Sequence, residues 1–266
     1  MGPGEADVPK DEAPAGASED TALAAAAAAL ADVAAARGRV YAALAAGFWQ
    51  PDGSLVDDLA AGTFAHEIAR SVAWLGPDAS WYGPGLRDLA GAASAVRAGP
   101  PDRALLALRV EHARLFEGPG RPVAVPFESA WTDRAEMGTP ALNGPPAARV
   151  VLRYRQAGLE RVASHRELPD HVAVELEFLY ELCRREAAAW RATDDGTARD
   201  LRAAADRFLR DHPSRWWPAF GERVILESRQ DLYRGLGRIL VAHLSIELGE
   251  AIEPSMFPWA AGRLPA

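Results

Sequence analysis

The sequence predicts an all-α protein: a single globular domain of about ten helices with a long central loop, after a disordered N-terminal tail. Apolar residues recur at helical spacing over long segments, and glycine or proline closes most of those segments. No run of alternating apolar and polar residues bounded by turn residues predicts a strand, and no fixed-period repeat is visible.

The composition is that of a globular chain with an acidic beginning. Of the 266 residues, 49% are apolar and 25% are charged, and the formal net charge is −8. Residues 1–20 hold six carboxylates and one lysine, which accounts for −5 of that charge and leaves −3 on the rest. A nucleic-acid-binding protein normally presents a basic face, so we expect no nucleic acid among the partners.

Cysteine usage excludes two further classes of protein. The only cysteine is Cys183, within an apolar helical segment. Neither a disulfide framework nor a cysteine zinc site can form within one chain, and we expect Cys183 to be a small buried hydrophobic residue.

The chain is predicted to have a tail, a domain and an extension. Residues 1–18 lack hydrophobic periodicity and are expected to be disordered, 19–250 form the helical domain, and 251–266 are a C-terminal extension. The acidic N-terminus does not resemble a secretory signal. The run 22–36 is too short and weakly apolar to span a bilayer, and Asp32 interrupts it. These features predict a cytoplasmic protein without stable membrane insertion.

The first helix is expected to begin at Asp20 or Thr21, either of which can cap it, and to run to Trp49. Alanine has the highest helix propensity, so the alanine-rich part needs little packing to be helical. The turn at 51–53, Pro-Asp-Gly, ends this element.

The remaining helices are predicted between successive glycine and proline breaks. They cover 54–61, 63–75 and 81–98, a helix opened by Asp102, a helix capped by Asn143 that ends at Gly158, a helix from Leu168 to Trp190, and segments 197–211, 213–227 and 229–248. Pro145 and Pro146 fit the first turn after Asn143, because amides in a first turn need no helical partner.

The central stretch, 111–133, begins as the end of an apolar helix. Five closely spaced breakers then exclude further helix: Gly118, Pro119, Gly120, Pro122 and Pro126. The loop next gathers aromatic, hydroxyl and carboxylate groups: Phe127, Glu128, Ser129, Trp131 and Asp133. Long loops without regular structure are usually functional, so we interpret this one as a binding surface.

Aromatic residues belong to the core by default, and the set considered is Phe127, Trp131, Trp81, Trp216 and Trp217. Trp131 differs because it lies in a polar loop segment beside Ser129 and Asp133. An aromatic ring flanked by carboxylates suits a partner that is partly apolar and partly cationic.

A second candidate is Pro169-Asp170-His171, where proline and an acid are also ordinary residues for the start of a helix. The positive end of a helix disfavours imidazolium. His171 is therefore expected to be a neutral ring held by a partner, for which Glu175, one turn later, is the candidate.

Other site chemistries are poorly supported. No Glu-x-x-His pair on two helices indicates a di-iron site, and His66-Glu67 lacks the second histidine of a zincin motif. Ser129 lacks the glycines of a nucleophile elbow, and the loop lacks the Gly-Lys-Ser/Thr end of a phosphate loop. We expect no metal, no cofactor and no catalytic residue.

With these two stretches identified, the sequence resembles the TorD/DmsD family of redox-enzyme maturation chaperones, which is related to NarJ. Its first signature, aromatic-x-Ser-x-Trp-x-Asp/Glu, is matched in full by 127–133. Its second, a Glu-Pro-x-Asp-His element, corresponds to 167–171, with the proline one place later than in the strict form. The resemblance extends from about Arg39 to about Leu248.

The resemblance implies an all-helical cytoplasmic chaperone, not an enzyme. The implied partners are the catalytic subunit of a molybdopterin-dependent oxidoreductase and its twin-arginine leader. The implied peptide-binding residues are Phe127, Glu128, Ser129, Trp131, Asp133, Glu167, Pro169, Asp170 and His171. Carboxylates beside apolar walls suit a leader that presents guanidinium groups next to an apolar helix. The chain is expected to be a monomer or a dimer.

Two alternatives remain open at the level of sequence. The chain could be a permanent helical subunit of an oxidoreductase complex, or a hydrolase that uses Ser129 and His171.

Overall fold

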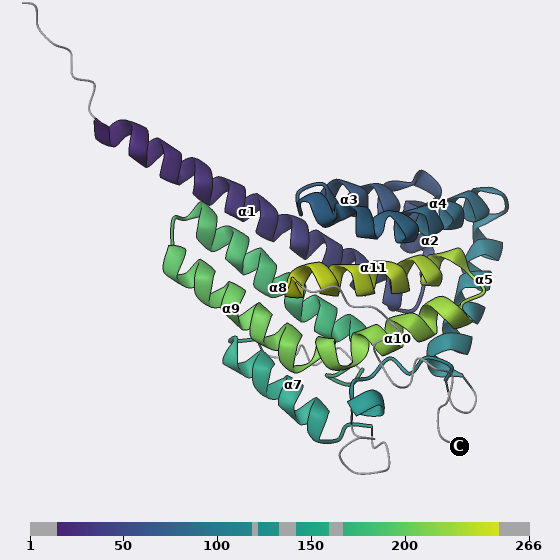
Figure 1. Ribbon diagram of the computed structural model, residues 1–266. Coiled ribbons are helices and arrows are strands. Elements are labelled where there is room, and N and C mark those ends of the chain that lie inside the picture. The colour runs from purple at the N-terminus through teal and green to yellow at the C-terminus, as the bar shows by residue number, and fades with distance from the viewer. Residues whose placement is uncertain (1–14, 119–121, 133–141, 160–166, 250–266) are drawn as a thin grey trace, which may run out of the picture.

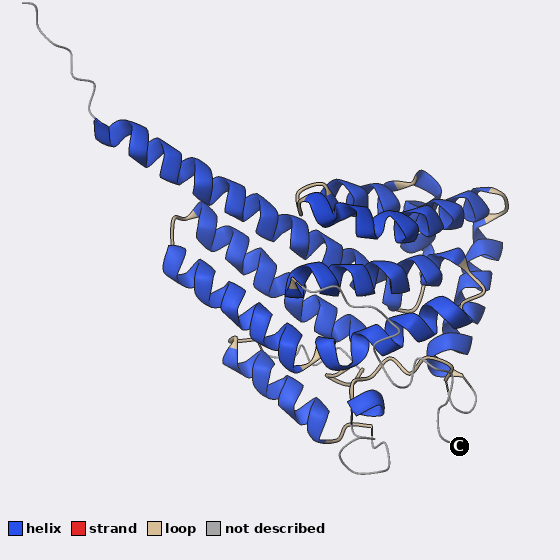
Figure 2. Ribbon diagram, viewed as in Figure 1, coloured by secondary structure: helices blue, strands red, loops and turns tan. Residues whose placement is uncertain are grey.

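The computed structural model describes residues 15–118, 122–132, 142–159 and 167–249. Within these ranges the protein consists of helices joined by short loops, without a strand, which confirms the predicted all-α class (Figure 2). One isolated antiparallel bridge joins Phe127 to His171.

Two long helices form the backbone of the molecule. Helix α1 (Ala15–Phe48) packs lengthwise along α8 (Val172–Arg191), and α9 (Asp195–Asp211) covers another side of α8 (Figure 1). The first described side chains of α1 are mostly exposed, whereas towards its C-terminal end Val40, Tyr41 and Leu44 are fully buried.

Helix α11 (Asp231–Leu248) lies between α4 (Gly83–Arg97) and α10 (Pro213–Glu227). Its approach to both neighbours depends on two glycines. A Cβ on Gly235 would lie 3.0 Å from the carbonyl oxygen of Gly85, and one on Gly237 would lie 2.9 Å from that of Gly221. Any side chain at these two positions would push the helices apart.

The other elements complete the bundle around these helices. They are α2 (Gly53–Ala61), α3 (Thr63–Val72), the 3-10 helix η1 (Pro77–Tyr82), α5 (Pro101–His112), the π-helical turn η2 (Ala113–Glu117) and α7 (Pro145–Gln156). Most predicted boundaries agree within two or three residues, because glycine and proline mark them in the sequence.

Several predictions of detail were wrong. Helix α1 begins at Ala15, inside the segment predicted to be disordered, because the alanine-rich sequence sustains helix before any core is reached. Asn143 does not cap α7: it has a left-handed backbone (φ 63°), and Gly144 precedes the helix. Trp81, assigned to the core, is 41% exposed, whereas Trp216 and Trp217 are fully buried. Cys183 is buried as predicted.

By length and composition alone, one helical stretch of the described chain, Thr21–Phe48, could cross a membrane. Its mean hydropathy of 1.2 is weak for a span. This finding differs from the expectation drawn from 22–36, because the helix continues into the apolar residues that pack in the core.

Candidate functional site

The two signature segments, far apart in sequence, lie side by side in the structure. Besides the bridge between Phe127 and His171, the amide of Glu128 donates a hydrogen bond to the carbonyl oxygen of Asp170 at 3.0 Å. The two signature segments therefore lie directly against each other.

Asp170 joins the two signatures through its side chain as well. Its Oδ2 accepts a hydrogen bond from the amide of Ser129 at 2.9 Å, and its side chain is fully buried. The amide of Ser129 begins a helical turn, 129–132, inside the stretch predicted to be irregular. Asp170 thus stabilises the start of that turn, in the way that a capping carboxylate stabilises a helix.

His171, not Asp170, caps α8. Its Nδ1 accepts a hydrogen bond from the amide of Ala173 at 3.2 Å, so this nitrogen carries no proton. Burial, together with the neighbouring His112, lowers the pKa of His171 to about 3. The ring stacks on Trp49, with centroids 5.0 Å apart and planes at 8°. The predicted neutral ring agrees with this geometry, but the predicted partner does not.

Glu175, expected to hold the ring of His171, instead accepts hydrogen bonds from two tryptophans. Its Oε2 accepts hydrogen bonds from the indole nitrogens of Trp216 at 3.2 Å and Trp217 at 3.0 Å. Burial, together with the negative charges of Glu128 and Asp170, raises the pKa of Glu175 well above its usual range. This carboxyl therefore favours its neutral form inside the protein.

Glu128 pairs with a histidine from the far end of the chain. Its Oε2 lies 2.8 Å from Nδ1 of His212, which precedes α10, and both side chains are buried. We call Glu128, Asp170 and Glu175 the acidic cluster. All three are fully buried, and each has one carboxylate oxygen without a hydrogen bond in the described part of the protein.

The exposed part of the site is mainly aromatic. Phe127, Trp131 and Glu167 are half-buried, whereas Pro169 is buried and its carbonyl accepts a hydrogen bond from Tyr154 at 2.8 Å. The indole of Trp131 donates to the carbonyl of Val125 at 2.8 Å. Trp131 also contacts core Phe220, with ring centroids 6.4 Å apart, so its indole is partly a core side chain.

One predicted contact, Asp133, lies outside the described residues. Of the other predicted peptide-binding side chains, Glu128, Ser129 and Asp170 are completely buried. They support the surface from beneath in this conformation and do not reach it.

The Ser129 and His171 pair lacks the geometry of a hydrolase. The Ser129 hydroxyl is buried and makes no hydrogen bond to any residue that the structure describes, and Nδ1 of His171 is occupied by the helix cap. A histidine with a pKa of about 3 is also a weak general base at neutral pH. Across the described ranges, no group of three or more His, Cys, Asp or Glu side chains could hold a metal ion.

Sequence reasoning missed four residues of the site: Trp49, Tyr154, Glu175 as a tryptophan acceptor, and His212. Trp49 and His212 lie next to helix ends, where the local sequence predicts the helix boundary but no tertiary contact. Glu128 and His212 are 84 residues apart in the sequence, and no local sequence pattern predicts that they pair.

Comparison with known proteins finds one matching family model, described as nitrate reductase delta subunit. It covers residues 82–222, more than half of the chain and both signatures.

Individual relatives match over shorter parts. The selenate reductase assembly chaperone protein of Thauera selenatis is 44% identical over 89 residues, which are 32% of this chain and 44% of the relative. The chlorate reductase assembly chaperone protein of Ideonella dechloratans is 39% identical over 94 residues, 34% of this chain and 46% of the relative. The chaperone protein TorD of Vibrio cholerae serotype O1 is 29% identical over 141 residues, 53% of this chain and 60% of the relative. The chain thus spans about half the length of these curated relatives.

Proposed function

The chain belongs to the nitrate reductase delta subunit family, and we propose that it is an assembly chaperone for a molybdenum-containing oxidoreductase. It binds the twin-arginine signal peptide of the catalytic subunit, its apoprotein or both in the cytoplasm, and assists cofactor insertion, assembly and export. It acts without catalysis. The similarity to assembly chaperones of selenate and chlorate reductases supports this function.

The observation that carries the proposal is the union of the two signatures into one surface. The bridge between Phe127 and His171 places the half-buried ring of Phe127 next to the buried ring of His171, over carboxylates that are committed to internal bonds. Such a surface offers apolar contact to a peptide without exposing a reactive group. Asp133 and Glu167 are the signature carboxylates that we assign to direct contact with the leader, while Asp170 and Glu128 hold the surface in shape.

A pull-down from the native cell tests this function. The tagged chain should retain the cofactor-free catalytic subunit of a molybdenum enzyme, identified by mass spectrometry. Phe127→Ala should reduce the recovery, because it removes a ring from the joined surface. Leu226→Ala is the matched control, since Leu226 is 69% exposed and belongs to neither signature. Recovery of no such subunit by the unmodified chain would refute the proposal.

The same pull-down distinguishes the chaperone from a permanent subunit. Stoichiometric recovery of the mature, cofactor-loaded enzyme would favour a permanent subunit instead.

Substitutions in the leader test whether its arginines are recognised. Replacing both leader arginines by glutamine should weaken binding more than replacing them by lysine, because lysine keeps the charge but loses the planar guanidinium.

A further inference from the structure

A groove adjoins the signatures on the side of Trp49. It has a volume of about 230 Å³ and lies between the end of α1, the start of α2 and Phe64 of α3. Its walls combine apolar side chains with two carboxylates: Ala46, Trp49, Leu55 and Phe64, with Asp52 and Asp58. The volume corresponds to roughly eight water molecules, which leaves room for a side chain of a bound peptide.

Both carboxylates are held in fixed positions. Oδ1 of Asp52 accepts from the amide of Leu55 at 3.1 Å and from the hydroxyl of Ser54 at 2.7 Å. Oδ1 of Asp58 accepts from the hydroxyl of Thr63 at 2.9 Å. Their Oδ2 atoms make no hydrogen bond with any other residue that the structure describes. Two oriented carboxylates of this kind match the donors of a guanidinium group.

The charges around the groove also favour a cation. The C-terminal end of α1, a helix of 34 residues, contributes partial negative charge next to Ala46. The N-terminus of α2 acts in the opposite sense, but the full charge of Asp52, its N-cap, exceeds the roughly half charge of a helix end. The neighbouring cation, Arg109, donates from its Nε to the carbonyl oxygen of Pro51 at 2.8 Å. Hydrogen bonds from Ser54 and Leu55, together with the charge of Arg109, keep the pKa of Asp52 below its usual value, so Asp52 is ionised at neutral pH.

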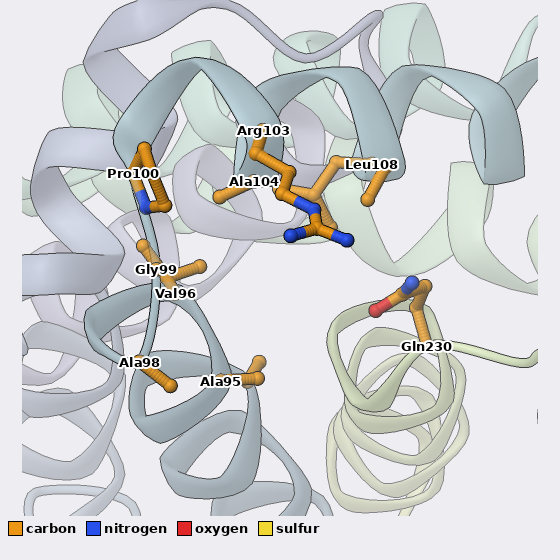
Figure 3. Close-up of a pocket in the computed structure, with 11 residues that line it drawn as sticks. Ala95, Val96, Ala98, Gly99, Pro100, Arg103, Ala104, Leu108 and Gln230 are labelled. Carbon is orange, nitrogen blue, oxygen red and sulfur yellow. The ribbon is translucent and has the colours of Figure 1, made fainter.

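A second groove provides a contrast. It measures about 320 Å³ and lies between α4, α5 and the start of α11 (Figure 3). Alanine, valine and leucine side chains line most of it, and Arg103 is the one charged residue among them. Arg103 would repel a guanidinium, so this second groove lacks the negative charge that the groove beside Trp49 combines with apolar walls.

We propose that the groove formed by Trp49, Asp52, Asp58 and Phe64 binds an arginine side chain of the client's leader peptide. This assignment rests on the proposed function and adds a guanidinium site to the contacts assigned there to Asp133 and Glu167. Trp49 connects the groove to the signatures through its stack on His171. A leader could thus place its arginine in the groove and its following apolar residues over Phe127 and Trp131.

Titration calorimetry with a defined probe tests the assignment. The probe is a capped peptide with two consecutive arginines followed by an apolar leucine–alanine segment. The double variant Asp52→Asn/Asp58→Asn should bind it about tenfold more weakly, since each exposed ion pair contributes up to about fivefold. Asparagine is as good an N-cap as aspartate, so α2 should remain intact, which an unchanged thermal midpoint would verify.

The control is Asp57→Asn, which removes one negative charge, half of the change in the double variant, from the same helix at a residue outside the groove. Its affinity should stay within about twofold of the unmodified protein. The assignment is overturned if the double variant binds as tightly as the Asp57→Asn variant, or if the unmodified protein does not bind the probe. In either case, client recovery in the pull-down would show separately whether the chaperone function stands.

Discussion

Two buried clusters of charged groups differ in what offsets the cost of burying their carboxyl groups. In the first, which we call the balanced cluster, Arg37 donates to Glu186 at 2.9 Å and to Glu247 at 2.7 Å, and Arg202 adds a contact to Glu247 at 3.2 Å. In the acidic cluster, three buried carboxyl groups face one histidine and two indole N–H groups.

The difference appears in the titration of the carboxyl groups. The pKa of Glu247 is lowered to about 2 although burial raises it, because the charge of Arg37, followed by those of His243 and Arg202, outweighs burial. The pKa of Glu175 is raised, because burial and two neighbouring carboxylates act in the same direction. The balanced cluster ties α1, α8, α9 and α11 together, whereas the acidic cluster lies under the joined signatures. Each carboxyl group of the acidic cluster keeps one oxygen without a hydrogen bond in the described part of the protein, at a cost in stability.

The largest effect is expected in the balanced cluster. Arg37→Met should lower the free energy of unfolding by about 3–5 kcal/mol at neutral pH, because it leaves Glu186 and Glu247 buried with too little positive charge. Urea denaturation would measure it. Arg199→Met is the control: its ion pair with Asp195 is exposed, so the loss should stay below about 1 kcal/mol.

The sign of the pH dependence in the balanced cluster follows from Glu247. Its folded pKa lies below the ordinary value of 4.5, so its stabilising contribution is present above that pH and disappears as the pH falls towards about 2. The deficit of Arg37→Met should shrink over the same window. A deficit that is independent of pH would mean that packing of the arginine, not charge, carries the effect.

A smaller effect is expected where the acidic cluster joins the signatures. Asp170→Ala leaves the buried amide of Ser129 without its acceptor, which should cost about 1–3 kcal/mol. Asp170→Asn keeps an acceptor oxygen and should cost about 1 kcal/mol or less. Equal stability of the unmodified protein and Asp170→Ala in urea would contradict the joining role of this carboxylate.

Sequence reasoning succeeded where the signal is local. Helix positions followed from spacing and breakers, and the two signatures could be identified because each occupies a few consecutive residues. It did not predict that Asp170 and Glu128 would be buried, since their partners, the Ser129 amide and His212, lie 41 and 84 residues away. The reassignment of Glu175 has the same origin: both tryptophans that bind it belong to α10, and only tertiary packing brings them to the start of α8.

The smallest expected effect concerns Glu175. Here the substitution should raise the free energy of unfolding, whereas the substitutions above lower it. Glu175→Gln keeps the shape and an oxygen that can accept from both indoles, while it removes the buried charge. Because the folded pKa is raised, the unmodified protein loses stability as the pH rises from about 4.5 through that raised pKa, and the variant does not. The variant should therefore match the unmodified protein in acid and exceed it by about 1 kcal/mol at mildly alkaline pH. Urea unfolding at several pH values would measure the difference. If Glu175→Gln is less stable at every pH, the ionised carboxylate is required by its tryptophan partners, and the acidic cluster is a stabilising feature like the balanced one.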